Sequence, residues 1–306
     1  MADSAIALRR VESEEDADVF LAIRRAIDSE HMPSRAAYLE HVKAPGRIDL
    51  IAELEREPVG TGFVERHGDD PSGPEGWVSV RVLAEFRRRG VGSALFQAVS
   101  EHARRDGRRA LTMSVQEVDR DSIVYLANRG YAEVMRVQES VLDLAAASSK
   151  WAPPAGVDLV PIDAELEPAV FETAVEIARD IPSADEVRID SIDQWRSDQL
   201  SALAMRECCF AALVDGEVVG YATLIAGAEG EGMHAMTGVR RPWRRRGIAL
   251  ALKQAQIDAA KTAGLRRLRA ANAVQNPMLA VNERLGYRKD VVWLHLRGPL
   301  LDAGAP

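Results

Sequence analysis

The chain has 306 residues, of which 47% are hydrophobic and 28% are charged. This balance is that of a globular protein, and the length favours two domains, because soluble domains usually contain about 100–200 residues. The formal net charge of −8 argues against a protein dedicated to nucleic acid, which usually carries a basic excess.

The first half of the chain is predicted to mix strands and helices. Alternating polarity indicates strands, apolar residues at helical spacing indicate helices, and Gly107 is placed to end the central helix. The expected order is a strand at 5–11, a helix at 14–28, a hairpin within 51–64, a strand at 77–82, a helix at 91–106, a strand at 110–115, a helix ending at Gly130 and a strand at 131–142.

The second half is predicted to repeat this order. Asp215-Gly216 between two apolar runs is a strong hairpin signal, and Gly264 is placed like Gly107 at the end of a helix. The expected order is a strand at 157–162, a helix at 166–178, hairpin strands at 210–214 and 218–225, a strand at 234–239, a helix at 248–263, a strand at 267–271, a helix ending at Gly286 and a strand at 287–296.

Matching motifs show that the two halves are copies of one unit. Gly247 lies 157 residues after Gly90 within similar arginine-glycine strings, and Gly286-Tyr287 lies 156 residues after Gly130-Tyr131. Small residues at 145–149, followed by a proline pair at 153–154, indicate a linker between the copies. We therefore predict domains at 1–149 and 150–306.

The most informative motif is a strand, then Arg-x-x-Gly-x-Gly or Ala, then a helix. The first N–H groups of a helix are unpaired and carry partial positive charge, so they attract anions. Glycine lets a phosphate approach the backbone, and arginine adds charge-assisted hydrogen bonds. Two copies of this basic helix start favour a pyrophosphate cradle over a turn that is only structural.

The motif resembles that of the GCN5-related N-acetyltransferase (GNAT) superfamily. The resemblance rests on Val82-x4-Arg87-x-x-Gly90-x-Gly92, on Val239-x4-Arg244-x-x-Gly247-x-Ala249, and on the stretch from Asn276 to Tyr287. It covers most of both halves and implies a tandem GNAT protein of mixed α/β class. Each domain is then a twisted, mostly antiparallel sheet flanked by helices.

The resemblance also implies a function and a set of coenzyme contacts. Such proteins transfer an acyl group from a coenzyme A thioester, most often acetyl-CoA, to a primary amine of a small molecule or a peptide. The loop would hold the pyrophosphate, and the preceding strand would hold the pantetheine arm. The implied coenzyme-binding residues are Val82, Arg87, Arg88, Arg89, Gly90, Val91 and Gly92 in the first half, and Val239, Arg241, Arg244, Arg245, Arg246, Gly247, Ile248, Ala249 and Asn276 in the second.

The two copies are not expected to be equivalent. Asn276 stands where the family often places a coenzyme contact, and counting back from the closing glycine puts Arg120 at that position in the first half. The C-terminal copy keeps more of the pattern, so we predict that it is catalytic. The N-terminal copy would bind a coenzyme without turnover, or only support its neighbour.

The residues for proton transfer are less clear in the sequence. Many relatives place a tyrosine four residues before the closing glycine, but Asn282 and Leu126 occupy those positions. His234 is the best candidate for a general base, with a structural histidine as the alternative. Strict strand alternation turns it to the other face of the sheet from Val239, and a bulge would reverse that.

Two other functions stay open. The tandem fold could sense acyl-CoA without catalysis, or the arginine clusters could bind nucleic acid, against which the net charge argues. The adjacent Cys208 and Cys209 are the only cysteines and seldom pair, so we expect a reducing, cytoplasmic location. No metal site and no membrane span are expected, and the acceptor and the oligomeric state are not predicted.

Overall fold

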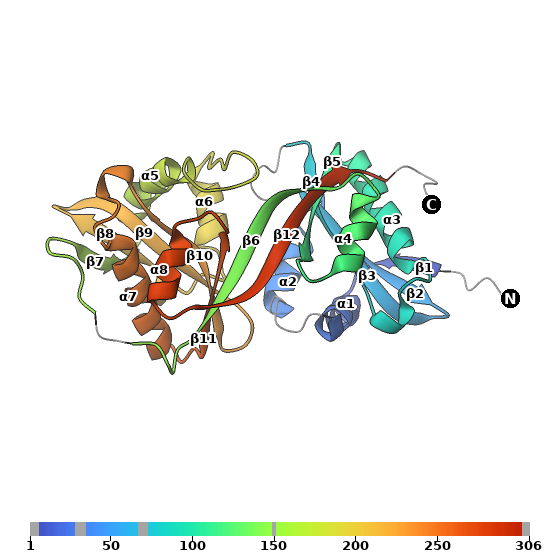
Figure 1. Ribbon diagram of the computed structural model, residues 1–306, viewed down its shortest axis with the longest axis horizontal. Coiled ribbons are helices and arrows are strands. Elements are labelled where there is room, and N and C mark those ends of the chain that lie inside the picture. Colours follow the sequence, from blue (N-terminus) through green and yellow to red (C-terminus); the bar gives the residue numbers. More distant parts are fainter. Residues whose placement is uncertain (1–5, 28–34, 67–72, 149–150, 302–306) are drawn as a thin grey trace. The chain divides into compact units, whose positions relative to one another are not determined.

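The computed structural model describes residues 6–27, 35–66, 73–148 and 151–301. The chain forms two compact units, one of Met1–Met135 with Leu294–Pro306 and one of Arg136–Trp293. Each unit is a mixed sheet with helices packed on it, so the predicted mixed α/β class is confirmed (Figure 1). None of the helices described has the length and apolarity that a membrane span requires.

The first unit has a mostly antiparallel sheet in the order β1-β2-β3-β4-β5, followed by the end of β12. Only β4 and β5 of the strands β1–β5 run parallel. Its elements are β1 (Ile6–Arg10), α1 (Glu14–Ile27), α2 (Arg35–His41), β2 (Ile48–Leu54), β3 (Glu57–Arg66), β4 (Glu75–Val82), η1 (Ala84–Phe86), α3 (Val91–Arg105), β5 (Ala110–Gln116) and α4 (Arg120–Ala127).

The second unit has the same plan, with β6-β11-β10-β9-β8-β7 as the strand order. Here β10 and β11 are the parallel pair. Its elements are β6 (Ala132–Asp143), β7 (Asp158–Pro161), α5 (Glu167–Ala178), α6 (Ile192–Gln199), η2 (Arg206–Cys208), β8 (Phe210–Val214), β9 (Glu217–Ala226), β10 (Glu231–Val239), η3 (Arg241–Trp243), α7 (Ile248–Thr262), β11 (Arg267–Ala273), α8 (Met278–Arg284) and β12 (Arg288–Pro299).

The turns explain why the chain folds this way locally. Asp215 and Gly216 between β8 and β9 have φ values of 50° and 82°, the left-handed geometry of a tight hairpin turn. Gly107 and Gly264 also have positive φ and end α3 and α7. The predicted hairpin turn and helix ends are therefore found in the structure.

The sheet of the second unit separates two packed faces. Tyr221 of β9 packs with Trp195 of α6 and Ile177 of α5, whereas its neighbour Ala222 packs with Leu252 of α7. α5 and α6 thus cover one face, and α7 covers the other (Figure 1).

The last strand of each repeat completes the other repeat's unit. The part of β6 from Val137 to Asp143 pairs antiparallel with Ala273 to Arg267 of β11, in the second unit. In return, the end of β12 lies in the first unit, where Pro299 accepts a hydrogen bond of 3.0 Å from Tyr131 and Arg297 pairs with Glu75 at 2.9 Å. The repeat boundary near residue 150 stays a prediction, and residues 149 and 150 lie outside the described ranges.

Candidate acyl-coenzyme A site

Each arginine-glycine loop joins the end of a central strand to a helix with the same backbone geometry. Arg88 and Arg245 have φ values of 63° and 64°, and the glycines that follow, Gly90 and Gly247, have φ values of 84° and 83°. These glycines are the N-terminal caps of α3 and α7. In each loop, two residues with left-handed backbone geometry and one residue between them turn the chain sharply. Backbone N–H groups therefore converge at the helix start.

The first arginine of each motif stabilises its loop. The Nε atom of Arg87 donates to the Val82 carbonyl at 3.1 Å, and that of Arg244 donates to the Val239 carbonyl at 2.9 Å. The third arginine, Arg246, lies over the ring of Trp243 at 4.7 Å. The sequence predicted phosphate contacts for all of these arginines. In the structure, Arg87 and Arg244 also bind backbone carbonyls of the preceding strand, and Arg246 also packs on Trp243.

The helix starts leave N–H groups available to an anion. The first helical hydrogen bonds run from Ala94 to Gly90 and from Ala251 to Gly247, both at 3.0 Å. The N–H groups of the helical residues before Ala94 and Ala251 therefore have no partner within the helix. The positive end of the helix dipole lies behind these N–H groups, and such a helix start attracts anions, phosphate groups among them.

The central parallel strands separate as they approach the loops. Pairing of β10 with β11 stops at Met233 opposite Arg269, although β10 continues to Val239. Pairing of β4 with β5 likewise stops at Trp77, although β4 continues to Val82. Backbone groups on this edge of each strand are thus open to an extended ligand with amide groups.

The C-terminal loop differs in its acidic neighbour. Asp180, just after α5, accepts hydrogen bonds from Arg241 (2.8 Å) and Arg244 (2.6 Å). These bonds, that from Arg241 foremost, hold the pKa of Asp180 far below its usual range. A ligand phosphate that uses either guanidinium must compete with this carboxylate.

The two halves match at Asn276 in a way that the sequence count missed. Asn276 and Asp119 each donate a backbone hydrogen bond to the last residue of the preceding strand, and the side-chain oxygen of each accepts a backbone N–H from the first turn of the following helix. Asp119, not Arg120, is therefore the counterpart of Asn276. The count failed because α8 (seven residues) is one residue shorter than α4 (eight).

His234 lies on the same face of the sheet as Val239 because β10 has a bulge. The register with β9 shifts between His234 and Met236, and His234 pairs with Leu224, which packs under α7. The bulge that the sequence analysis left open is present, and it turns the imidazole toward α7.

Hydrogen bonds occupy both ring nitrogens of His234. Gln256 donates from Nε2 to the Cys208 carbonyl at 3.1 Å, so its Oε1 accepts from Nδ1 of His234 at 3.0 Å. Nε2 of His234 then accepts from the Tyr287 hydroxyl at 2.5 Å. Burial, and secondarily the charge of Lys253, hold the pKa of His234 well below its usual range. This geometry favours the structural alternative for His234 over a general base.

Lys253 of α7 was not among the residues predicted from the sequence. It lies on the buried face of α7 with 1% of its surface exposed, and its amine is 5.2 Å from the centre of the Tyr287 ring. Its Nζ atom has no hydrogen-bond partner among the described residues. A lysine on the apolar face of a predicted helix was the available signal.

The positions of the family's usual tyrosine carry no acid. Asn282 is buried and donates to Asn272 at 2.9 Å, and Leu126 is buried in the first unit. No group of three or more His, Cys, Asp or Glu side chains within the described ranges is arranged to hold a metal ion.

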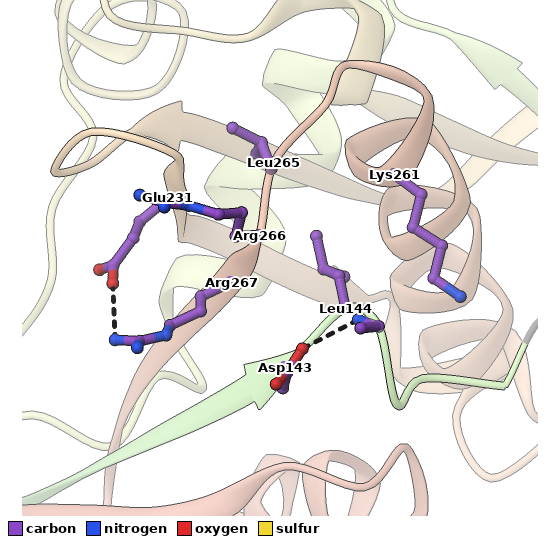
Figure 2. A pocket seen from close by; sticks show the side chains of 8 residues that line it. Asp143, Leu144, Glu231, Lys261, Leu265, Arg266 and Arg267 are labelled. Atoms are coloured by element: carbon purple, nitrogen blue, oxygen red, sulfur yellow. Dashed lines mark hydrogen bonds and ion pairs between the residues drawn. The ribbon is translucent and has the colours of Figure 1, made fainter.

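A pocket of about 550 Å³ lies away from the loop, at the start of β10 (Figure 2). Glu231 and Arg267 line it and form an ion pair of 3.3 Å, with Asp143 and Lys261 also in its wall. Val239, next to the cradle, is eight residues further along β10, or about 26 Å at 3.3 Å per residue. This pocket is therefore separate from the arginine-glycine loop.

Comparisons with known proteins agree with the repeated geometry. A family model described as "Acetyltransferase (GNAT) family" matches residues 14–131 and again 171–287. No curated protein matches the sequence significantly.

Solved structures share the fold over the whole chain. A GCN5-related N-acetyltransferase from Sphaerobacter thermophilus is 19% identical with a TM-score of 0.78, and the match covers 97% of this chain and 96% of that one. A tandem GNAT protein from the clavulanic acid biosynthesis pathway is 21% identical with a TM-score of 0.75, covering 98% and 100%. With both halves matched by the family model, the chain belongs to the acetyltransferase (GNAT) family and contains two copies of its domain.

Proposed function

We propose that the protein is an acyl-CoA-dependent N-acyltransferase that transfers an acyl group, most simply acetyl, to a primary amine of a small molecule or a peptide. The observation that carries this proposal is the combination, in each unit, of a left-handed glycine cap and a separated parallel strand pair. The cap offers N–H groups to a pyrophosphate, and the open strand edge offers amide partners to a pantetheine arm.

The reaction makes three demands on such a site. The amine must be uncharged to attack the thioester, the developing oxyanion needs hydrogen-bond donors, and the departing sulfur needs a proton. The open edge of β10 beyond Met233 supplies backbone groups beside the thioester, and the bulge at His234 changes their direction. We place turnover in the second unit, because its bulged strand and its buried polar side chains lie together there.

The direct test is the release of thiol from acetyl-CoA in the presence of a panel of primary amines. We expect stoichiometric amide formation with at least one amine. Binding of acetyl-CoA without thiol release for any amine would instead support the alternative function, an acyl-CoA sensor.

Asp180 provides a prediction about coenzyme affinity. Asp180→Asn should tighten the binding of coenzyme A to the second unit about threefold to fivefold, because it frees Arg241 and Arg244 from a competing anion. Titration calorimetry at low and at high salt measures this, and the gain should shrink with salt. Asp193→Asn, which removes a carboxylate paired with Arg196 instead, is the matched control. Weaker binding by Asp180→Asn would show that Asp180 positions the arginines.

The arginine cluster gives no support to nucleic-acid binding. Arg240 pairs with Glu176 and Glu217, and Arg241 and Arg244 pair with Asp180, so carboxylates already engage three of the five guanidinium groups near the loop.

A further inference from the structure

The second unit contains a buried polar cluster formed by Lys253, His234, Gln256 and Tyr287. Hydrogen bonds connect the last three in the order Gln256, His234, Tyr287, and Lys253 lies over the tyrosine ring. Lys253 and Gln256 are 1% and 0% exposed. Within the part of the chain that the structure describes, Lys253 is the member of this cluster whose polar atom has no partner.

The first unit keeps only one member of this cluster, with Tyr131 in the place of Tyr287. Phe96 and Val99, five and eight residues into α3, correspond to Lys253 and Gln256 of α7. Val78 pairs with Val64 of β3 as His234 pairs with Leu224 of β9. These three counterparts are apolar and are at most 2% exposed, so the same packing positions are filled without any polar group.

The cluster therefore has a cost that the first unit avoids. Burying an amine without a hydrogen-bond partner is unfavourable, by several kcal/mol for a charged group. Burial lowers the pKa of Lys253 to about 7, so the amine exchanges its proton near neutral pH. His234 of β10 and Tyr287, the residue before β12, are the ionisable groups that face it. Both stay uncharged near neutral pH, because burial lowers the pKa of His234 and raises that of Tyr287.

The cluster lies where β10 and β11 separate. His234 is the first residue of β10 beyond the paired Met233, and Tyr287 packs against Leu268 and Ala270 of β11. Val239, at the cradle, is five residues from His234, or about 16 Å along an extended strand. An extended chain that follows β10 from the cradle over this distance ends beside His234, at the cluster.

We propose that Lys253 is the general acid of the C-terminal acyltransferase site, which donates its proton to the sulfur of the departing coenzyme A. This inference rests on the proposed function. The amine nitrogen attacks the thioester carbon, the C–N bond forms, and the C–S bond breaks with its electron pair on sulfur. The ammonium of Lys253 gives sulfur a proton to form the thiol, and the surplus proton of the new amide nitrogen restores the ammonium.

This role fits both the chemistry and the missing tyrosine. A thiol has a pKa of about 8.5, so an ammonium that titrates near pH 7 can protonate the thiolate and be recharged at neutral pH. Asn282 and Leu126, at the usual tyrosine positions, cannot do this. The first unit has Phe96 in place of Lys253, so we expect it to bind a coenzyme without rapid turnover.

The test compares Lys253→Met with the wild type in single-turnover thiol release from acetyl-CoA. We expect the variant to be slower by about 100-fold or more, with unchanged acetyl-CoA affinity. The wild-type rate should fall as the pH rises through the pKa of Lys253. The rate of the variant should show no such decrease. The acetyl thioester of thiophenol, whose thiolate leaves with little need of a proton, should be affected much less. Lys261→Met, at the end of the same helix, is the matched control.

The stability of the same variant shows whether it folds. Lys253 has a pKa of about 7 in the folded state and of 10.5 in the unfolded state. Burial of Lys253 therefore lowers the free energy of unfolding most at and below pH 7, where the amine is protonated in both states. Lys253→Met should therefore melt at a higher temperature than the wild type at pH 7, with the difference vanishing as the pH approaches 10.5. A variant that melts lower at pH 7 would show that Lys253 stabilises the fold and would overturn the inference.

Two results would separate the inference from the proposed function. If the wild type is active and Lys253→Met has the same rate and the same pH profile, the role of Lys253 is overturned and the proposed function stands. If Lys253→Met slows the reaction equally with acetyl-CoA and with the thiophenol thioester, Lys253 maintains the structure of the site and is not the general acid. A wild type that binds acetyl-CoA but releases no thiol with any amine would overturn the proposed function, and this inference with it.

Discussion

Gly247→Glu should raise the dissociation constant of coenzyme A at the second unit by at least about 100-fold, or ~2.8 kcal/mol. The residue at this helix cap has a φ of 83°, which strains any L side chain, and glutamate adds a negative charge where the pyrophosphate would bind. Titration calorimetry should show the loss of one binding site, with the melting temperature measured in parallel.

Three companion variants identify the cause. Gly247→Ala keeps the backbone strain without the charge and should lose much less affinity. Gly264→Glu, at a φ of 79° beyond the other end of α7 with open space around it, should leave binding unchanged. Gly90→Glu applies the same test to the first unit. Unchanged stoichiometry in Gly247→Glu or Gly90→Glu would refute the cradle in that half.

Removing residues 294–306 should unfold much of the first unit and leave the second folded. The deletion takes the end of β12 from beside β5, together with the Pro299 acceptor of Tyr131 and the ion pair of Arg297 with Glu75. Hydrogen exchange should show lost protection in β4 and β5 and retained protection in β8–β10.

A shorter deletion controls for the loss of chain length. Removing only residues 302–306 leaves every described contact of β12 in place and should preserve protection in both units. Equal protection of β5 in the full-length protein and in the chain that ends at Trp293 would contradict the strand exchange.

Local features of the fold were predictable because they depend on local chemistry. The arginine-glycine loops, the Asp215-Gly216 turn and the helix ends at Gly107 and Gly264 are found where the sequence indicates them. Each is a short stretch whose backbone needs glycine, or a residue with a similar preference, at one position.

Features that depend on distant partners were not predictable in the same way. The pattern of residues 131–142 indicates a strand, but nothing in it shows that β11 of the other repeat is its neighbour. The bulge at His234 follows from the register with β9, so its direction required the structure. Lys253 is an intermediate case, because comparison with Phe96 in the other copy would have shown a polar residue at a core position.

The exchange of strands has a consequence for the order in which the protein forms. Domains of a multidomain chain generally fold one after another as the ribosome releases them. Here the first unit cannot close its sheet until residues near Pro299 have been made, although most of its chain emerges early. During synthesis of the whole second repeat, the edge of β5 that later receives β12 is exposed, and such edges invite pairing with other chains. Completion of the first unit therefore waits until the second repeat has been synthesised.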